Sequence, residues 1–538
     1  MLETFDPTAI ADEGLRSIVV LLMTEVERLS AEVRALTDEN QRLRDENRRL
    51  KGEQGRPMIR PQTVSSEHER HTPRPHHKGA KQRHVPIDRD EIRRVDPTHL
   101  PPDAQFKGYV DVVVQDVCFQ TDNVLFHKEK FYSPGEKRTY LAPLPQGYHG
   151  QFGPGVRAWV LSLADASGVS QPKIKDLLAT VGIRISAGEL SALLIKEQER
   201  FHQERQDIVR AGVASTPYAH LDSTATRVYG QNYACHVLCN PYYTAYSTQP
   251  SKDRVSVVAA LLGGEEPSFL LNAQTLALMQ EWKVPRTWMR EVQARLPWAA
   301  VLSEAQVTAL LEGSTLPWYR AKEVRAALAV SYYHTQTRMP VVPLLVVDDA
   351  AVFTTLTEER ALCWVHAWRH DKKLAPRIAY HQACLQTFGA DFWAFYRRLR
   401  AYREDPTPAE AKAIRQAFDV LFGTPSGYAH LDHRAAITRT KKEQLLTVLR
   451  HPAVPLHNNP AELGARQRVR KRDLSLAART PEGVAAWDTF QTIVETAKKL
   501  GVNVTAYLRD RLTGRDALPS LASVITAHAA ADALACAA

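Results

Sequence analysis

The chain has 538 residues, enough for two to four folded domains, and its 44% hydrophobic and 24% charged residues are ordinary for a soluble globular protein. No apolar run reaches the roughly 18 residues of a membrane-spanning helix, so a membrane-spanning protein is excluded. The six cysteines are scattered and no secretory signal precedes them, which excludes a disulfide framework and predicts a cytoplasmic protein. The net charge of +9 favours anionic partners.

Residues 1–50 are predicted to form an oligomerisation helix. Leucine recurs every seven residues, and valine or asparagine fills the paired positions: Leu22, Leu29, Leu36, Leu43 and Leu50, with Val19, Val26, Val33, Asn40 and Asn47. Glutamate and arginine flank this seam, which is typical of a parallel two-stranded coiled coil. The alternative is a single helix that lies on the core of its own protein.

Two further segments separate this helix from the rest of the chain. Residues 51–104 are rich in Pro, His, Arg and Lys without apolar periodicity, which predicts a basic flexible linker. The linker either contacts DNA phosphates or is only a solvated tether. Residues 105–150 are interpreted as a small β-rich segment, because the pattern over 107–133 alternates between apolar and polar residues.

Residues 151–215 are predicted to be helical and to contain a pair of helices. QPKIKDLLATVGIRISAGELSALLIK holds two amphipathic stretches around Gly182 and Ser186, which resembles a helix-turn-helix. Such a pair can bind DNA, and it is equally common in purely structural helical bundles.

From residue 216 the pattern changes to strands. HLDSTATRVYG, QNYACHVLCN and YYTAYSTQP are three β-rich runs, expected to be adjacent antiparallel strands. SKDRVSVVAALL suits a helix, and VVPLLVVDD suits a buried strand. Cys235 and Cys239 are close together, but no second pair completes a zinc site, so we interpret them as thiols on a buried strand. These runs predict a core over 216–264 and 336–475, interrupted by a helical insertion over 265–335.

The remaining segments are predicted to be helical. Residues 375–450 are expected to form several helices, and 457–512 two or three more. Residues 476–538 are assigned to C-terminal helices and an Ala-rich tail, which we expect to be loose after residue 513.

Three acidic residues stand at notable places in this order of elements. Asp222 lies within the first strand, Asp348 follows the buried strand, and Glu462 follows a helix start at Asn458, Asn459 and Pro460. Three strands, a helix, a strand ending in aspartate and a later helix with glutamate is the order of a ribonuclease-H-like fold. In that fold the helix would cover both aspartates. Three carboxylates together suit two magnesium ions, which can promote displacement at phosphorus.

Each acid also has a plainer interpretation. Asp222 could be a structural aspartate that is hydrogen-bonded within its strand. Asp348 and Asp349 are adjacent, so only one of them can face the sheet centre; we prefer Asp348 because it directly follows the apolar run. Glu462 could simply complement the positive end of its helix.

These motifs resemble those of the insertion sequence 66 family, a group of DDE-type bacterial transposases. The similarity is greatest in LHNNPAELGARQRVRKRDLSLAARTPEGVAAWDTFQTIVETAKKLGVNVTAYLRD, and it recurs in LLVVDDAAVF and ALCWVHAWRHDKKL. HLDST is similar to the family's first aspartate segment. Together with the predicted coiled coil, the resemblance covers most of the chain.

The resemblance implies a function for particular residues. Asp222, Asp348 and Glu462 would be the catalytic acids that bind two divalent ions, magnesium or manganese. His366 and Arg369 would lie near the site and contact DNA, although His366 could equally be a core histidine. The basic residues after Glu462 would position DNA phosphates: Arg466, Arg468, Arg470, Lys471 and Arg472.

The expected protein is therefore a multidomain α+β transposase of the bacterial nucleoid, at least dimeric, which cleaves transposon ends and joins them to target DNA, with or without accessory proteins. Two alternatives stay open: an inactive DNA-binding descendant of such an enzyme, and a metal-dependent nuclease without strand transfer.

The chain departs from the family's pattern at several places. Only Cys118 stands where the family has a cysteine-rich zinc segment, so no zinc is predicted. Ser223 replaces a common glutamate, His457 an acid and Leu463 an arginine. These changes identify a divergent member.

Overall fold

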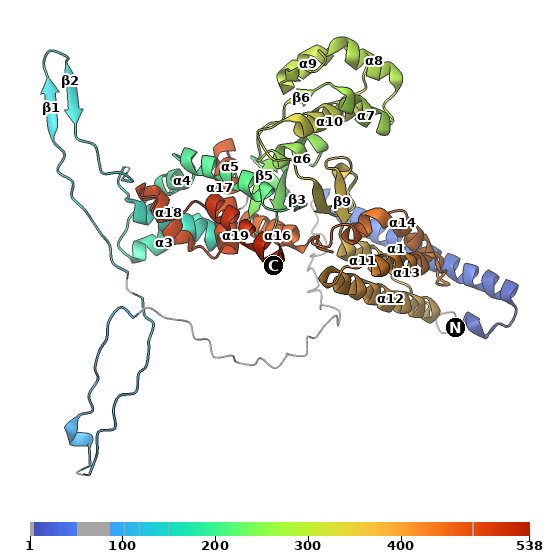
Figure 1. Cartoon of the computed structure of the whole chain (residues 1–538), viewed down its shortest axis with the longest axis horizontal. Helices are drawn as coiled ribbons and strands as arrows, with labels where there is room; N and C mark the ends of the chain where they lie inside the picture. Colours follow the sequence, from blue (N-terminus) through green and yellow to red (C-terminus); the bar gives the residue numbers. More distant parts are fainter. Residues whose placement is uncertain are drawn as a thin grey trace. The chain divides into compact units, whose positions relative to one another are not determined.

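The computed structural model describes residues 5–50, 87–101, 103–117, 119–148, 150–475 and 478–537 (Figure 1). Contacts divide the chain into two compact units, Met1–Leu29 with Val124–Ala538, and Ser30–Asn123. Most of the predicted linker, 51–86, lies outside the described residues. None of the described helices combines the length and the apolarity that a bilayer span requires.

The first part of the chain is mostly helical. Its elements are η2 (Pro7–Ala9), α1 (Glu13–Leu50), η3 (Pro97–His99), β1 (Lys130–Ser133), β2 (Arg138–Leu141), α2 (Pro154–Leu161), η4 (Ser162–Ala166), α3 (Gln171–Thr180), α4 (Ala187–Ile195) and α5 (Glu199–Ala214). The predicted helix pair is confirmed as α3 and α4. Gly182 between them has a φ of +82°, which favours glycine, and Ser186 caps α4 with Glu189 in a reciprocal capping box.

The predicted helix over residues 1–50 is confirmed as α1, and its leucine seam is exposed. Leu22 is 57% and Leu29 48% exposed, whereas Met23, on another face, is 1% exposed. From that second face, Glu27 Oε1 accepts a hydrogen bond of 2.8 Å from the Ile378 N–H at the start of α12 (Ala379–Glu404). The first half of α1 therefore packs on the chain itself and still leaves its heptad seam open.

The predicted sheet over 107–133 is wrong in its extent. The described residues of 107–129 form no strand, and pairing begins only with β1, which forms an antiparallel hairpin with β2. The earlier valines, such as Val110 and Val114, are 90% and 80% exposed. A segment with alternating polar and apolar residues forms a sheet only when a second strand pairs with it. Among the described residues of 107–141, only β1 has such a partner, which is β2 across the Pro134–Gly135 turn.

A five-stranded mixed sheet forms the centre of the larger unit. Its strands are β3 (Tyr218–Val228), β4 (Gln231–Cys239), β5 (Thr244–Gln249), β8 (Leu344–Val347) and β9 (Glu359–Leu362), in the order β5-β4-β3-β8-β9. The three predicted antiparallel neighbours are confirmed as β3, β4 and β5, and the predicted buried strand as β8. β8 and β9 run parallel to β3. β9 was not predicted. Cys235 and Cys239 are buried free thiols on β4, as interpreted.

The outer edge of the sheet is covered by α17 (Pro481–Lys499). The N–H groups of Thr244, Tyr246 and Thr248 on β5 donate to side chains of α17. Their acceptors are spaced four residues apart along the helix: Thr496, Thr492 and Asp488. One turn of helix matches two residues of strand in length, so each free donor meets an acceptor. The helix thus satisfies an edge that would otherwise offer unpaired donors.

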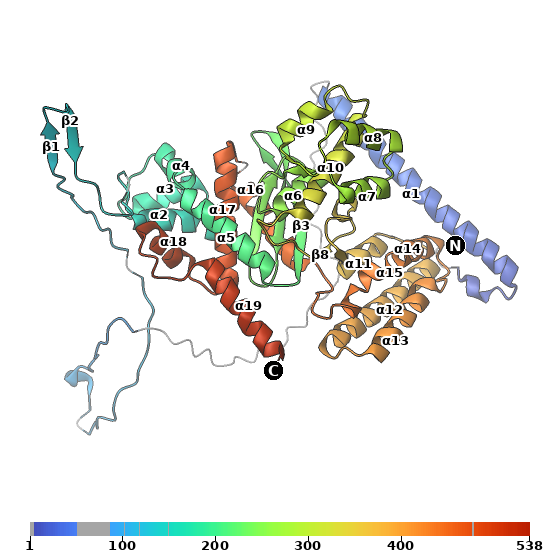
Figure 2. The same ribbon diagram turned by 45° about the horizontal axis from the view of Figure 1, so that its top comes forward.

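The predicted helical insertion is confirmed, with one addition. It follows α6 (Arg254–Leu261) and comprises β6 (Phe269–Leu270), α7 (Ala273–Glu281), α8 (Arg286–Arg295), β7 (Val301–Leu302), α9 (Glu304–Leu311) and α10 (Trp318–Thr335). The addition is the short β6–β7 ladder. Figure 2 shows α6 and α10 on one side of the sheet and α16 (Asn459–Ser475) on the other.

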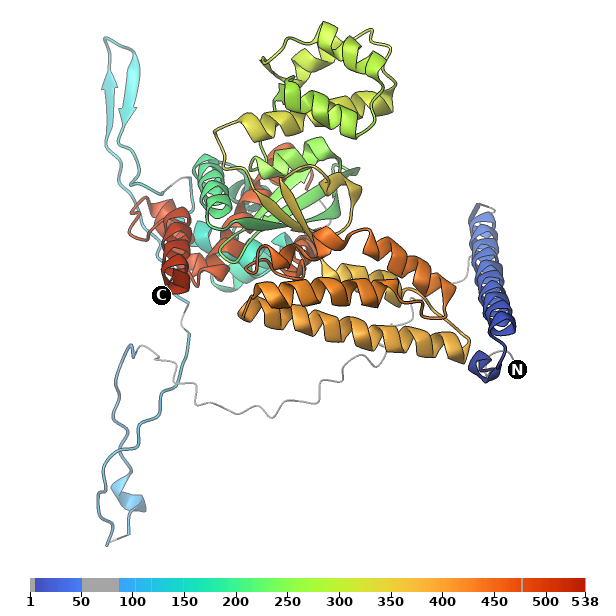
Figure 3. The same ribbon diagram turned by 45° about the vertical axis from the view of Figure 1, so that its right-hand side comes forward.

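The C-terminal half is helical, as predicted. After η5 (Ala351–Phe353) come α11 (Trp364–Lys372), α12, α13 (Pro408–Gly423), α14 (Ala429–Arg439), α15 (Lys442–Leu445), η6 (Thr447–Leu449), α16, α17, α18 (Val504–Thr513) and α19 (Leu521–Ala537). Figure 3 shows the long helices α12 and α13 side by side. The expected loose tail is wrong, because residues 521–537 form α19, which packs on α5 and buries Leu521 and Ile525. Alanine is the strongest helix former, so an Ala-rich segment with two apolar anchors folds as a helix.

Glu204 on α5 predicts a pH dependence of stability. Burial raises its pKa to about 7, and Tyr507 Oη donates to its carboxylate. The folded chain therefore keeps a proton that the unfolded chain releases above about pH 4.5, so this stabilisation is lost as pH rises to 7. Glutamine cannot titrate, so the free energy of unfolding of Glu204→Gln relative to that of wild type should rise by up to about 3 kcal/mol from pH 5 to pH 8. Urea unfolding at each pH measures this difference. A difference independent of pH would contradict this.

Candidate active site

The register of the sheet brings Asp222 and Asp348 to the same level. β3 and β8 are parallel neighbours, and His220 pairs with Val346. Asp222 and Asp348 are each two residues further along their strands, so they stand side by side at the carboxyl end of β8. The Asp348 carboxylate accepts a 3.0 Å hydrogen bond from the Ala350 N–H, and Asp222 accepts one of 2.8 Å from the Ser223 N–H.

α16 carries Glu462 over the face of the sheet that holds Asp222. Asp222 pairs with Val237 on β4, and directly opposite residues of an antiparallel pair share a face. Gly464 on α16 contacts that face, because a Cβ there would lie 2.7 Å from Val237 Cγ1. Tyr246 Oη also donates to the Gly464 carbonyl at 3.0 Å. The absence of a side chain at Gly464 thus lets α16 approach closely, with Glu462 half a turn earlier on the helix.

Asn458 fixes the start of α16 to two other elements. Its Nδ2 donates to the Leu221 carbonyl on β3 at 2.8 Å, and its Oδ1 lies 3.0 Å from His220 Nδ1. The Asn458 N–H donates to Cys363 Sγ, at the start of α11, at 3.2 Å. All of these groups are buried. The side chain that sequence analysis treated as a helix start is therefore a buried link between the strand of Asp222, α11 and the helix of Glu462.

Asp348 and Glu462 both act on Asp222. Burial raises the pKa of Asp222, and the carboxylates of Asp348 and Glu462 raise it further. Glu462 is the acid with the closest cationic partners: Arg369 Nη2 lies 2.9 Å from its Oε2 and Arg369 Nη1 lies 3.3 Å from its Oε1. His366 Nδ1 lies 3.5 Å from the same Oε1. The predicted neighbours of the site, His366 and Arg369, are thus both beside Glu462.

Asp348 and Asp349 differ as expected for adjacent residues at a strand end. Asp349 forms an ion pair with Lys441, which precedes α15. Asp348 raises the pKa of Asp222. The preference for Asp348 thus agrees with the geometry, and Asp349 offers a matched acid outside the cluster.

Two of the predicted DNA contacts require correction. Arg468 is 2% exposed and forms an ion pair with Asp488, and Lys471 is 8% exposed and forms one with Asp165. The buried residues of α16 recur about once per helical turn, on the face toward the protein: Ala461, Gly464 with Ala465, Arg468 and Lys471. Both cations are therefore internal, and neither presents its charge to DNA.

The other cations of this run face outward. Arg466 and Arg470 are exposed. Arg472 is partly exposed and donates to the Ala225 carbonyl on β3 at 2.5 Å. Sequence analysis missed Lys252, an exposed residue whose Nζ donates to the Ser223 carbonyl at 3.1 Å, one residue beyond Asp222. In the sequence, the only sign of Lys252 is that it stands just before the helix predicted for SKDRVSVVAALL.

The donor set fits a hard divalent cation better than a soft one. Asp222, Asp348 and Glu462 are partly buried carboxylates on one face of the sheet, and oxygen is the preferred ligand of Mg²⁺. Cys363, His366 and Glu462 also place donor atoms within 4.8 Å of one another. Cys363 Sγ, however, is already bound to the Asn458 N–H, and His366 Nε2 to Arg369 Nη1 at 3.0 Å.

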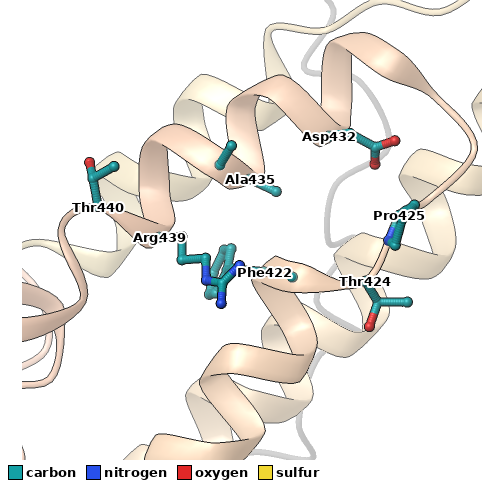
Figure 4. Close-up of a pocket in the computed structure, with 9 residues that line it drawn as sticks. Phe422, Thr424, Pro425, Asp432, Ala435, Arg439 and Thr440 are labelled. Atoms are coloured by element: carbon teal, nitrogen blue, oxygen red, sulfur yellow. The ribbon is translucent and has the colours of Figure 1, made fainter.

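A separate pocket lies between α13 and α14 (Figure 4). Its wall includes Phe422, Thr424, Asp432 and Arg439. None of its lining residues belongs to the acidic cluster or contacts it.

Comparison with known proteins gives the cluster a context. Residues 293–486 match the model of a family described as the IS66 family of transposases. This match includes Asp348, Glu462, His366 and Arg369 but begins after β3, so the choice of Asp222 depends on the sheet register.

One protein relative extends the similarity. The chain is 28% identical over 326 residues to the uncharacterized protein y4jO of Sinorhizobium fredii, a match that covers 60% of this chain and 100% of that protein. No solved structure matches the chain. Residues 293–486 are thus similar to the transposase domain of the IS66 family.

Proposed function

We propose that the protein is a DDE-type DNA transposase with a ribonuclease-H-like core. The observation that carries this proposal is the placement of Asp222 and Asp348 at the same level of neighbouring strands, with the carboxylates of Asp348 and Glu462 near enough to raise the pKa of Asp222. The sheet order, with β3 flanked by antiparallel β4 and parallel β8, supports the core fold.

In this proposal the three acids hold divalent cations, either magnesium or manganese. When bound, such cations activate the attacking oxygen and stabilise the leaving oxygen of an in-line displacement at phosphorus. The chain itself orients the acids: β3 and β8 place the two aspartates, and Gly464 and Asn458 place Glu462. His220, which contacts Asn458, supports this arrangement. Burial lowers the pKa of His220 to about 4, so the ring is neutral at pH 7 and adds no positive charge near the acids.

Exposed cations would hold the DNA backbone beside these acids. Arg466 and Arg470 on α16, with Arg472 and Lys252 along β3, present positive charge on the surface around the cluster. Such contacts fix the register of the duplex and do not read its bases.

We further propose that the α1 seam pairs two copies of the chain and that α3 and α4 bind the element's ends.

The test is an assay with the full chain and linear DNA that carries the sequences flanking the gene. With Mg²⁺ or Mn²⁺ we expect strand breaks at the ends, followed by joining of the 3′-hydroxyl ends to a target plasmid. Cleavage without joined product would replace the proposal with a nuclease. Binding without cleavage in either metal would replace it with a DNA-binding protein.

A further inference from the structure

Arg369 engages Glu462 with its whole guanidinium group. Nη1 and Nη2 each face one carboxylate oxygen, at 3.3 and 2.9 Å, so the contact is bidentate. The Glu462 side chain is only 15% exposed, whereas Arg369 is 44% exposed. The pair therefore lies at the mouth of the acidic cluster, with its carboxylate inside and its guanidinium toward solvent.

His366 holds the guanidinium in this position. An arginine always donates, so the 3.0 Å contact between Arg369 Nη1 and His366 Nε2 makes Nε2 the acceptor and leaves the ring proton on Nδ1. Nδ1 lies 3.5 Å from Glu462 Oε1 and has no hydrogen-bond partner among the described residues. His366 and Arg369 are three residues apart on α11, so one rigid helix face presents both to Glu462.

A carboxylate that gives both oxygens to an arginine has fewer lone pairs and less uncompensated charge to offer a divalent cation, so the two ligands compete. Bidentate arginine pairs are strong and geometrically specific, and the same planar fork fits a phosphate equally well. Arg369 therefore has two alternative anionic partners: Glu462, which it contacts in this structure, and a phosphate of bound DNA.

We propose that Arg369 is a positioning residue that competes with the divalent cation for Glu462, and that its guanidinium, once displaced, binds a DNA phosphate. The inference depends on the proposed metal-binding function of the three acids. It couples the two ligands of the site: the cation releases the arginine, and the DNA phosphate keeps it from returning to Glu462.

Metal affinity tests the competition directly. We would titrate Mn²⁺ into the full chain without DNA and measure binding by electron paramagnetic resonance. Arg369→Ala should bind Mn²⁺ about five- to twentyfold more tightly than wild type, and Arg369→Lys, which keeps the charge but loses the fork, at least about threefold more tightly. The matched control is Arg466→Ala, which removes an exposed arginine one turn beyond Glu462 and should change affinity by less than about twofold at 0.15 M salt.

The outcomes separate the possible failures. Unchanged or weaker Mn²⁺ binding by Arg369→Ala would show that the arginine preorganises Glu462, which overturns the competition. Equal gains in Arg369→Ala and Arg466→Ala would overturn it too, since only net charge would then matter. If the wild-type chain and every variant failed to bind Mn²⁺, the proposed function itself would fail.

The salt dependence of DNA binding tests the second half. On a duplex that lacks the element's ends, wild type with Mn²⁺ should make about one more phosphate contact than Arg369→Ala, so the slope of log affinity against log salt should differ by about one. In EDTA the two slopes should agree, because Glu462 then retains the arginine. A difference of the same size in EDTA would contradict the transfer of Arg369 from Glu462 to DNA.

Discussion

Asp348→Asn is expected to lower the rate of end cleavage about a thousandfold or more, while Asp349→Asn changes it by less than about threefold. Asparagine keeps the shape of Asp348 and can still accept from the Ala350 N–H, but it loses the charge that binds a cation. A cation contributes several kcal/mol of transition-state stabilisation, and about 1.4 kcal/mol corresponds to tenfold in rate. The measurement is single-turnover cleavage of end DNA in Mn²⁺.

Asp349 is an unusually close control. It is the next residue in the chain and carries the same charge, but it forms an ion pair with Lys441 instead of facing the cluster. Equal losses in the two variants would mean that the strand end as a whole, and not one carboxylate, supports the reaction. A dominant loss in Asp349→Asn would reverse the assignment.

Arg468→Ala is expected to destabilise the protein by about 3–5 kcal/mol. The substitution leaves Asp488 buried without its cation, although Asp488 still accepts from the Thr248 N–H and Oγ1 at 2.6 and 2.8 Å. The guanidinium also packs over the rings of Tyr246 and Trp487, at 5.4 and 5.7 Å from their centroids. Thermal and urea unfolding of the full chain would measure the loss.

Two companion variants make this prediction specific. Arg466→Ala removes an exposed arginine from the same helix and should change stability by no more than about 0.5 kcal/mol. Adding Asp488→Asn to Arg468→Ala should recover part of the loss, because the uncompensated buried charge is gone. If Arg468→Ala instead weakened DNA binding without changing stability, the buried ion pair would not exist in solution.

The sequence predicted the central sheet well because its signals are local. Three alternating runs joined by short turns, and one unbroken apolar run, were sufficient for β3, β4, β5 and β8. β9 was not predicted because its four residues, Glu359–Leu362, do not alternate between polar and apolar. The strand is stabilised by parallel pairing with β8. Such pairing is a tertiary property, and no pattern in so short a segment reveals it.

The assignment of Asp222, Asp348 and Glu462 as the site acids stays a prediction, made from their order along the chain. The sheet register that sets Asp222 beside Asp348 agrees with that order. The role of Asn458 was invisible, because its partners on β3 are more than two hundred residues away. The basic run RQRVRKR led to a wrong prediction for a related reason. Its sequence does not show which residues face the protein. In the structure, Gly464 packs on the sheet, and this orientation of α16 buries Arg468 and exposes Arg466.

The N-terminal helix illustrates a limit of periodicity. Heptads predict an apolar seam, and that seam is exposed at Leu22 and Leu29. The same helix also packs on its own chain through Met23 and Glu27, on a face that no repeat marked. The packing of a single helix on its own chain therefore holds for the face of Met23 and Glu27, and pairing of two chains through the leucine seam stays a prediction.

The most direct test of the proposed active site is the location of Mn²⁺ in crystals of the full chain, determined from anomalous scattering. We expect manganese bound by oxygens of Asp222, Asp348 and Glu462, with Asp349 still paired to Lys441. Manganese bound elsewhere, or three carboxylates that point apart and bind none, would contradict it.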